Sequence, residues 1–543
     1  MKHLILKISV AFLVLVPSSV FSQENLPLMK AEYFVTHYYT DNANGIEWSV
    51  IPRIKCDILK LYKPNAKKQK VKFVSDVDSI EFTVKKGKPI DFNILLKGDT
   101  AHTRIIFNNE LPNTISTEDK LLALSLFWSE AKYNFAFFDN LTFDWDSLYR
   151  TYIPLVIQSK NDLEFGNIMR KFVGTLQDGH TNFAGPYYAR PYGDVYGLGV
   201  KFFSDTLRVI MIDSLLSEKI PLGSKILKIN DIPTMEYIET FIYPYVTAHY
   251  PPTQRMLAEN RFFNSHGHSN EFMKLSFLTP SGEMRNETIF RDGSSKQHPR
   301  IGRIETRPYD TNAISWIDKN IAILTLTTFK YEEIVDWIRK NRDTLYTADG
   351  IIIDIRNNQG GSTLIAKHFL QYLIKDSVYL GFGSASRLHN GVKKAQGNFI
   401  SKWEEYYRMR AYDTVFPSVN HIPDSIRRFE CPVVILTSTW TVSAAEDFLI
   451  MLYERPDRPK FIGRPTFGST GAPLVIKNWP IPNSFARICA RKVLYPYSLK
   501  AFDEGIVPDI WIEPTFEEFM SGKDIDIDAA VKEIELQLNA KKE

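Results

Sequence analysis

The sequence predicts an α/β multidomain protein, and three observations lead to this prediction. A chain of 543 residues is longer than one hydrophobic core organises. Short alternating apolar runs dominate residues 23–112, whereas residues 305–543 contain β-branched runs separated by helical patterns. Residues 113–190 lie between them and repeat apolar residues at helical spacing. We therefore expect an N-terminal β domain, a helical segment and an α/β core, with a further domain inserted at residues 191–292.

Charge and composition are those of an ordinary globular protein. The 66 Lys and Arg residues nearly balance the 63 Asp and Glu residues, which leaves a formal net charge of +3. No run of like charge is long enough to form a basic stripe. The sequence therefore predicts no nucleic-acid partner.

The first 22 residues have the features of a secretory signal peptide. Lys2 and Lys7 precede the apolar run Ile8–Val16, which is too short to span a bilayer, and small residues follow it. No later segment has the length and apolarity of a membrane helix. We expect a protein that is exported across the inner membrane to the periplasm and is not stably inserted in a membrane after cleavage.

Residues 23–112 are predicted to form an antiparallel, sandwich-like β domain. Alternating runs occur at 71–74, 80–84 and 92–96, and turn-rich pieces such as Lys86-Gly87-Lys88-Pro89 separate them. These runs carry no recognisable chemistry.

The three cysteines, Cys56, Cys431 and Cys489, are widely spaced. They match neither a disulfide framework nor a metal-ligand pattern, and no His/Cys/carboxylate cluster has metal-ligand spacing. We predict no metal and no cofactor.

The helical segment 113–190 ends in a candidate functional histidine. Asp178-Gly179 is typical of a tight turn, so His180 is expected just beyond a turn that follows a helix. The alternative is a loop histidine without a chemical role.

The inserted segment contains two motifs in order. Tyr196-Gly197-Leu198-Gly199-Val200 comes first, and the turn Pro221-Leu222-Gly223-Ser224 then leads into a strand over 225–230. This segment, up to about residue 292, resembles a PDZ module. The resemblance implies that a peptide C-terminus binds the backbone N–H groups of Gly197, Leu198, Gly199 and Val200, and that the peptide adds as a strand to a sheet edge.

The α/β core places a serine at a strand-to-helix junction. Buried strands are predicted at 321–326, 350–356 and 432–436, and their alternation with helices favours a parallel sheet. Ser443 follows the last of these strands and precedes a helix that begins near Ala444. Ser443 is either a helix N-cap or a nucleophile displayed beside unpaired backbone donors.

Four motifs in the core carry a family resemblance. They are Asp354–Gly361 (DIRNNQGG), Thr441–Glu446 (TVSAAE), Ile462–Ser469 (IGRPTFGS) and Gly505–Asp509 (GIVPD). In this order, and with a PDZ-like segment before them, they resemble the C-terminal-processing (tail-specific) serine peptidase family over roughly residues 117–512. The resemblance implies a ClpP/crotonase-like α/β catalytic core.

One position departs from the family pattern. In the Ser-Lys members a lysine follows Thr-Phe-Gly, whereas this chain has Ser469 there. The tricorn-like branch uses a histidine instead, and Asp178-Gly179-His180-Thr181 is similar to its Asp-Gly-His-Thr motif. Members with a Ser-His-Ser-Glu site place a serine directly before that histidine, where this chain has Gly179.

The tricorn-like resemblance implies Ser443 as nucleophile and His180 as general base, since an imidazole can activate a serine hydroxyl. The expected oxyanion donors are the N–H of Ala444 and that of Gly360 or Gly361, because glycine permits close backbone approach.

Three other residues near these motifs have open roles. Glu504, or alternatively Asp503, is expected to orient the imidazole, unless both are exposed loop acids. Ser469 either bonds within the site or is a turn residue. Glu446 is expected to support the helix start.

Together these features predict a secreted serine-type endopeptidase that cleaves peptides or unstructured proteins. The alternative is a catalytically inactive peptide- or hydrophobic-ligand-binding protein on the same fold. The sequence does not indicate the oligomeric state.

Overall fold

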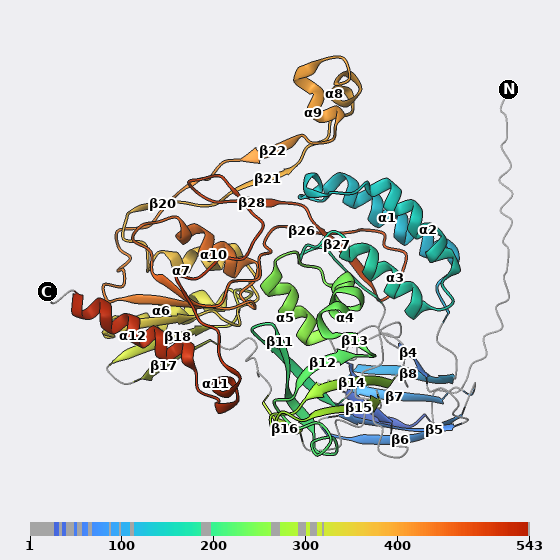
Figure 1. The fold of residues 1–543 in the computed structure, drawn as a ribbon. Helices are drawn as coiled ribbons and strands as arrows, with labels where there is room; N and C mark the ends of the chain where they lie inside the picture. Colours follow the sequence, from blue (N-terminus) through green and yellow to red (C-terminus); the bar gives the residue numbers. More distant parts are fainter. Residues whose placement is uncertain are drawn as a thin grey trace, which may run out of the picture. The chain divides into compact units, whose positions relative to one another are not determined.

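The structure is a computed structural model, and it describes residues 26–31, 35–39, 48–50, 57–62, 68–75, 77–85, 88, 90–96, 99–108, 113–185, 197–261, 272–290, 300–303, 312–317 and 320–540. The predicted signal peptide and Cys56 lie outside these residues. The described strands up to residue 108 form one compact unit, and the residues from 113 onward form a second. The described chain is a mixture of helices and several sheets, which confirms the predicted α/β class (Figure 1).

The first unit contains two four-stranded sheets. One has the order β1-β7-β8-β4 and the other the order β3-β2-β5-β6. Phe73 and Phe92, one from each sheet, pack with ring centroids 4.8 Å apart, so the sheets bury aromatic side chains between them. The strands are β1 (Leu28–Ala31), β2 (Val35–Tyr39), β3 (Trp48–Val50), β4 (Asp57–Tyr62), β5 (Lys68–Ser75), β6 (Ser79–Lys85), β7 (Ile90–Leu96) and β8 (Asp99–Asn108).

The expectation of a purely antiparallel domain is wrong for two strand pairs. β1 pairs with β7 and β4 pairs with β8 in parallel. In both cases the paired strands are separated in the chain by strands of the other sheet. Alternation of apolar residues reports which face is buried but carries no information on strand direction.

The second unit begins with three helices joined by short connections. They are α1 (Thr117–Asn134), α2 (Trp145–Gln158) and α3 (Asp162–Gly174), with the 3-10 turn η2 (Phe138–Asn140) after α1. Side-chain caps from Ser116, Asp144 and Asn161 satisfy the first N–H groups of the three helices. Their buried face includes Phe127 and Phe172, whose rings pack edge to face.

An antiparallel sheet of order β10-β11-β12-β14-β15 follows, with β13 on β12 and β16 on β11. Its elements are β10 (Leu198–Phe203), β11 (Thr206–Asp213), β12 (Lys225–Ile229), β13 (Ile232–Pro233), α4 (Thr234–Phe241), η4 (Tyr243–Tyr245), α5 (Pro251–Arg261), β14 (Phe272–Leu278), β15 (Met284–Phe290) and β16 (Arg300–Gly302).

The central sheet of the second unit has the order β17-β18-β19-β24-β25-β30. All neighbours pair in parallel except β17, which is antiparallel to β18. The strands are β17 (Asn312–Ile317), β18 (Ile321–Leu326), β19 (Gly350–Asp354), β24 (Val433–Thr437), β25 (Lys460–Gly463) and β30 (Ile510–Trp511).

Helices cover both faces of this sheet, which explains the continuous apolar runs of its strands. Ile435 faces a core that also contains side chains of α6 (Glu333–Leu345), α7 (Thr363–Leu370) and α10 (Ala444–Tyr453). Its neighbours Val434 and Leu436 face a second core with α12 (Ile525–Ala540) (Figure 1). Two cores therefore fix β24, and with it the position at which the chain leaves the sheet toward Ser443.

Smaller elements surround the core. A three-stranded sheet joins β26 (Pro473–Val475), β27 (Phe485–Cys489) and β9 (Asn182–Ala184), and β20 (Val378–Leu380) pairs with β23 (Val419–His421). A fourth sheet has the order β22-β21-β28-β29, and α8 and α9 lie at the tip of its β21–β22 hairpin (Figure 1). These elements are β21 (Gly383–Arg387), α8 (Gly391–Gln396), η6 (Ser401–Trp403), α9 (Glu404–Tyr407), β22 (Tyr412–Val415), β28 (Lys492–Leu494), β29 (Ala501–Phe502) and α11 (Phe516–Ser521).

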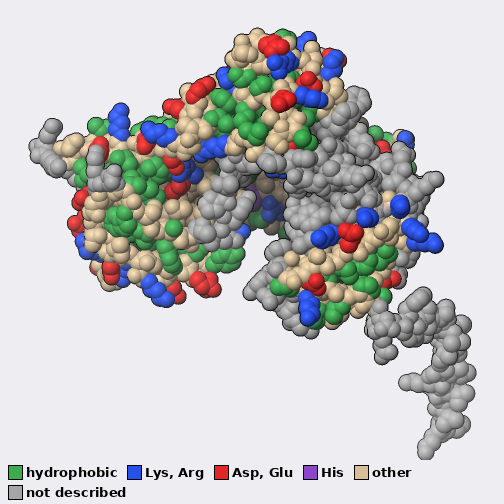
Figure 2. Space-filling model, turned by 90° about the horizontal axis from the view of Figure 1, so that it is seen from below, with side chains coloured by type: hydrophobic (Ala, Val, Ile, Leu, Met, Phe, Trp, Pro, Cys, Tyr) green, Lys and Arg blue, Asp and Glu red, His purple; other side chains and the backbone are tan. Residues whose placement is uncertain are grey.

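The surface carries both signs of charge. Lysine and arginine side chains alternate with aspartate and glutamate side chains over the face in Figure 2. Among the described residues, no helix combines the length and apolarity needed to cross a bilayer.

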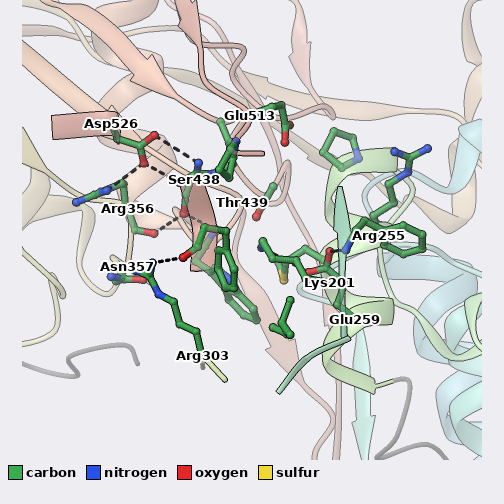
Figure 3. A pocket seen from close by; sticks show the side chains of 18 of the residues that line it. Lys201, Arg255, Glu259, Arg303, Arg356, Asn357, Ser438, Thr439, Glu513 and Asp526 are labelled. Atoms are coloured by element: carbon green, nitrogen blue, oxygen red, sulfur yellow. Dashed lines mark hydrogen bonds and ion pairs between the residues drawn. The ribbon is translucent and has the colours of Figure 1, made fainter. Parts of the chain in front are cut away.

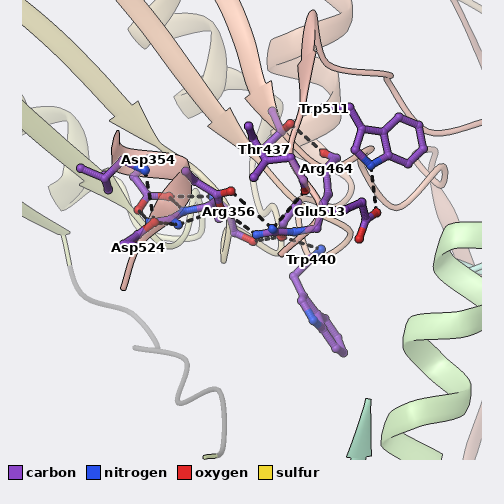
Figure 4. Close-up of polar contacts among 12 residues, drawn as sticks. Asp354, Arg356, Thr437, Trp440, Arg464, Trp511, Glu513 and Asp524 are labelled. Atoms are coloured by element: carbon purple, nitrogen blue, oxygen red, sulfur yellow. Dashed lines mark hydrogen bonds and ion pairs between the residues drawn. The ribbon is translucent and has the colours of Figure 1, made fainter. Parts of the chain in front are cut away.

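An ion-pair network ties the start of α12 to the end of the parallel sheet (Figure 4). Asp526, 2% exposed, pairs with Arg356 at 3.0 Å and with Arg464 at 2.7 Å. Arg356 also pairs with Asp354 at 2.7 Å and Asp524 at 2.8 Å. The network holds both arginine segments, one before Gly360 and the other before Ser469, against α12.

We expect Asp526→Ala to lower the free energy of unfolding by about 3 kcal/mol, because it leaves two largely buried guanidinium groups without their shared partner. Asp528→Ala is the matched control: Asp528 also lies in the first turn of α12, but its side chain is 52% exposed. Chemical denaturation of the two variants measures the difference. Equal loss of stability in the two variants would mean that Asp526 stabilises the protein only through the dipole of α12 and not through its pairs with Arg356 and Arg464.

Candidate active site

Ser443 has a strained backbone at the start of α10. Its φ of 61° and ψ of −124° lie in a region that favours glycine. Its N–H donates to Ser469 O and to Glu446 Oε2, each at 3.2 Å, so contacts from two segments hold this conformation. Ser443 thus occupies the N-cap position of α10, as expected from the sequence. Its positive φ differs from the extended backbone of an ordinary N-cap residue.

The turn that carries His180 is fixed by a buried carboxylate. Asp178 Oδ2 accepts hydrogen bonds from the N–H groups of His180 at 3.0 Å and Thr181 at 3.1 Å. The Thr181 hydroxyl oxygen accepts from the N–H of Cys489 at 3.0 Å. The next residues form β9, which pairs with β27 and so joins this segment to the α/β core.

The structure brings the predicted nucleophile and base together. His180 Nε2 lies 3.1 Å from Ser443 Oγ, although the two residues are 263 positions apart in the chain. His180 Nδ1 lies 2.7 Å from Ser469 Oγ. If Nδ1 carries the proton and donates it to Ser469, Nε2 presents its lone pair to Ser443.

Ser469 occupies the space that a side chain at position 179 would need. A Cβ atom on Gly179 would lie 2.9 Å from Ser469 Cβ and 2.4 Å from Phe467 Cε1. Both distances are shorter than any normal contact, so this packing requires glycine at 179. The hydroxyl group beside the imidazole therefore comes from the turn after β25, and not from the residue before His180.

Glu446 connects the nucleophile segment to the Ser469 turn. Its carboxylate is fully buried and accepts four hydrogen bonds. The donors are Thr466 Oγ1 and Gly468 N, each at 2.6 Å, Ser469 N at 3.0 Å and Ser443 N at 3.2 Å. Burial raises the pKa of Glu446 to about 8, and these donors oppose that rise. Glu446 therefore supports the helix start, as expected, and also positions the turn that faces His180, which the sequence reasoning missed.

Burial keeps His180 neutral over a wide pH range. The residue is 7% exposed, and its pKa falls from the usual 6.5 to about 4. Burial is the largest cause, and the positive charges of Arg487 and Arg491 add to it. A neutral imidazole can accept the proton of a serine hydroxyl.

The predicted oxyanion donors lie close to Ser443, but one of them is already engaged. A Cβ atom on Gly360 would be 2.8 Å from Ala444 N, so the two backbones are in contact. The Gly360 N–H donates to Asn358 Oδ1 at 2.9 Å, which corrects its assignment as a donor to substrate. Ala444 is the first residue of α10, and its N–H has no acceptor within the helix. Gly361, at φ 141°, forms a β-bridge with Phe329.

Asn358 was missed by the sequence reasoning. It is fully buried, and its side chain donates to Leu326 O at 3.1 Å while accepting from Gly360. Its backbone oxygen accepts from Val442 N at 3.0 Å. Asn358 thus joins the end of β18, the glycine turn and the segment before Ser443. The signal in the sequence was an amide side chain two residues before the Gly360-Gly361 pair.

Glu504 does not orient His180 in this structure, which corrects that expectation. The Nδ1 atom that it was expected to face lies against Ser469 Oγ, and Glu504 is exposed. Only the backbone at Glu504 and Gly505 approaches the site, where it packs on Gly468. Asp503 lines a cavity of about 260 Å³ together with Gly179 and Ser469.

The predicted peptide-binding residues Gly197, Leu198, Gly199 and Val200 line another cavity, of about 1110 Å³. It lies between β10 and α5 on one side and the ends of the parallel strands on the other (Figure 3). Lys201, Arg255 and Glu259 point into this region from β10 and α5. Trp440, three residues before Ser443, also lines the cavity, so it adjoins the nucleophile segment.

Comparison with known proteins identifies the α/β core. Residues 320–512 match the sequence model of peptidase family S41. This match confirms the predicted resemblance to the C-terminal-processing peptidases. No curated protein sequence matches the chain.

Solved structures share the fold. Mature CPAF superposes with a TM-score of 0.57 at 16% sequence identity, and the alignment covers 78% of this chain and 98% of CPAF. Mature CPAF complexed with lactacystin gives a TM-score of 0.56 at 15% identity, over 78% of this chain and 99% of that chain. At these identities the likeness establishes the fold alone.

We expect Ser443→Gly to be about 1 kcal/mol more stable than Ser443→Ala, because glycine adopts the observed φ and ψ without steric strain. Neither variant has an Oγ atom, so their difference reports the backbone alone. Denaturant unfolding of both proteins measures it. Equal or lower stability of the glycine variant would show that no strain is stored at this residue.

Proposed function

We propose that the chain is a secreted, periplasmic endopeptidase of the tail-specific, tricorn-like type, because its residues 320–512 match the sequence model of peptidase family S41. Ser443 is its nucleophile and His180 its general base. The observation that carries this proposal is the 3.1 Å approach of His180 Nε2 to Ser443 Oγ. A serine hydroxyl needs such a base near neutral pH, and 3.1 Å is within hydrogen-bonding reach.

The proposed reaction is acyl transfer. Ser443 Oγ attacks the scissile carbonyl carbon while His180 Nε2 accepts its proton, and the Ala444 N–H stabilises the oxygen that becomes negative. His180 then gives its proton to the leaving amine, and water hydrolyses the acyl-enzyme. Ser469 keeps Nδ1 hydrogen-bonded during both transfers. Because its hydroxyl can donate or accept, it holds the imidazole less strictly than a carboxylate would.

The proposed substrates are peptides or unstructured proteins whose C-terminal end binds the segment 197–200. Two observations support this part. β10 is an edge strand of the sheet β10-β11-β12-β14-β15, where it pairs with β11. The N–H of Phe202 in β10 donates to Glu259 of α5 at 2.7 Å, so a backbone donor of this edge points toward the helix. A peptide that adds to β10 would replace Glu259 at this donor.

We expect Ser443→Ala to reduce peptide hydrolysis by at least 1,000-fold, because the nucleophile is lost. The assay is cleavage of unstructured peptides, followed by mass spectrometry. A serine-directed phosphonate should label the wild-type protein at Ser443 and leave the variant unmodified. Lactacystin is a second probe, because mature CPAF was solved in complex with it.

The same labelling experiment separates this proposal from the binding-protein alternative. Stoichiometric modification of Ser443 agrees with an enzyme. Undiminished cleavage by Ser443→Ala would remove Ser443 from the mechanism, and absence of labelling under every condition would favour a binding role.

The pH dependence follows from the lowered pKa of His180, about 4. The base works when neutral, so kcat/KM should stay level from pH 7 to about pH 5 and fall as the pH drops through about 4. An acid limb near pH 6.5 would contradict the buried imidazole.

The same lowered pKa affects stability. The unfolded chain binds this proton below about pH 6.5 and the folded chain only below about pH 4, so the free energy of unfolding decreases as the pH falls from about 6.5 to about 4. Circular dichroism at each pH separates unfolding from titration.

A further inference from the structure

A second cavity lies on the Nδ1 side of the proposed general base. Its volume is about 260 Å³, and Gly179 and Ser469 both line it, so we call it the Ser469 cavity. The Ser469 hydroxyl contacts His180 Nδ1, whereas Ser443 contacts Nε2, on the other side of the ring. Its described lining residues include neither Ser443 nor any residue of the larger cavity between β10 and α5. The Ser469 cavity is therefore separate from both the nucleophile and the proposed peptide groove.

The walls of the Ser469 cavity come from five segments of the second unit. The lining residues lie within 135–143, 175–179, 248–250, 467–470 and 502–503. Two hydrogen bonds join three of these walls: the Thr253 hydroxyl donates to Phe467 O at 2.6 Å, and His249 Nδ1 lies 3.3 Å from Gln177 O. The cavity is thus enclosed by contacts of the chain itself.

Aromatic rings form much of this wall. The rings that line the cavity are those of Phe135, Phe137, Phe143, Tyr250, Phe467 and Phe502. Phe135 and Phe502 are buried, whereas Phe143 is 39% exposed and lies toward solvent. Aromatic rings pack against apolar groups, and their faces also attract cations.

The carboxylates that line the Ser469 cavity give it a negative charge. They belong to Asp178 and Asp503, and His249 is the only basic residue among the described lining residues. Asp178 is 8% exposed, and the three hydrogen bonds that it accepts from His180 and Thr181 all end on Oδ2. Burial raises the pKa of the Asp178 carboxyl, although these bonds oppose the rise. A cation in the cavity would stabilise the ionised carboxylate that holds the His180 turn.

An organic cation suits this lining better than a metal ion. A metal ion needs several oxygen, nitrogen or sulfur ligands, and no group of three His, Cys, Asp or Glu side chains in the described part of the chain could hold one. Aromatic walls, by contrast, are a common means of binding ammonium groups. A cavity of about 150 Å³ accommodates benzene. About 260 Å³ therefore admits a benzylammonium ion or the end of a lysine side chain.

We propose that the Ser469 cavity binds an organic cation, with the ammonium or guanidinium group at Asp503 and Asp178 and the apolar part against the aromatic rings. Two sources offer this chemistry: a free amine, and a lysine or arginine side chain of a substrate. The site is a feature of its own, because binding to it does not require that the protein cleave peptides. Since Asp178 also holds the turn of His180, a bound cation is coupled to the proposed base.

The first test compares two ligands of similar shape at pH 8. Benzylamine is a cation at this pH and benzyl alcohol is neutral, so the ratio of their dissociation constants reports the charge. Ligand-observed NMR titration of the full chain measures both constants. Wild type should bind benzylamine roughly 10-fold more tightly than benzyl alcohol.

Two neighbouring carboxylates provide a variant and its matched control. Asp503→Asn should reduce the ratio to within about threefold of unity, because it removes the more accessible carboxylate of the cavity. Retained binding of benzyl alcohol shows that the cavity of this variant is intact. Glu504→Gln removes the next carboxylate in the chain, which is exposed and lies outside the cavity lining, and should leave the ratio unchanged.

A second pair of variants tests the aromatic wall. Phe143→Leu replaces a ring of the cavity by an apolar side chain and should weaken benzylamine binding about threefold. Phe241→Leu is the control, because Phe241 is similarly exposed, at 47%, but does not line the cavity. It should leave the affinity unchanged.

Hydrolysis identifies the source of the cation. After mass spectrometry has located a cleavage position, the peptide is made with lysine or methionine at each position beside it. If the substrate supplies the cation, wild type prefers a lysine peptide, benzylamine competes with it, and Asp503→Asn loses the preference. If a free amine is the ligand, lysine and methionine peptides are cleaved equally and benzylamine does not compete with them.

Binding separates this inference from the proposed function. Equal affinities for benzylamine and benzyl alcohol, or a cation preference that persists in Asp503→Asn, would overturn the cation site and leave the peptidase proposal intact. A cation preference that depends on Asp503, in a wild-type protein that neither cleaves peptides nor is labelled at Ser443, would support the site and overturn the peptidase proposal.

Discussion

The site depends on the pairing of β9 with β27. Three residue pairs of this antiparallel ladder, Phe485↔Ala184, Ala486↔Phe183 and Arg487↔Asn182, join the segment after His180 to the α/β core. Burial of Phe183 and Ala486 in one apolar cluster stabilises the ladder. A slip of one residue would turn these side chains to the opposite face, so burial fixes the register and the register fixes the imidazole.

Around the imidazole, hydrogen bonds to backbone groups take the place of a directly contacting carboxylate. Glu446 reaches the site through the N–H groups of Ser443, Gly468 and Ser469, and only the Ser469 hydroxyl meets His180 Nδ1. A fully buried carboxylate with four donors resists displacement, so it holds both the nucleophile segment and the Ser469 turn. His180 is less basic than an ordinary histidine, because burial lowers its pKa, the positive charges of Arg487 and Arg491 add to that effect, and no carboxylate of the described residues bonds to its ring.

Gly179 and Ser469 illustrate how a departure from a family pattern is resolved in three dimensions. In sequence, Gly179 looks like a missing serine and Ser469 like a missing lysine. In the structure, the absence of a side chain at 179 provides the room in which the Ser469 hydroxyl approaches Nδ1. The two positions are 290 residues apart, so no local pattern connects them.

The sequence by itself determined the features that depend on near neighbours. These include the buried strands of the core, the turn before His180 and the strand-to-helix junction at Ser443, since periodicity, turn chemistry and capping act over a few residues. Only the tertiary structure decided that the Ser469 hydroxyl faces His180 Nδ1, that the N–H of Gly360 is already bonded to Asn358, and which strands run parallel. Those outcomes depend on packing between distant segments, where burial, register and the need to satisfy every buried polar group select one arrangement.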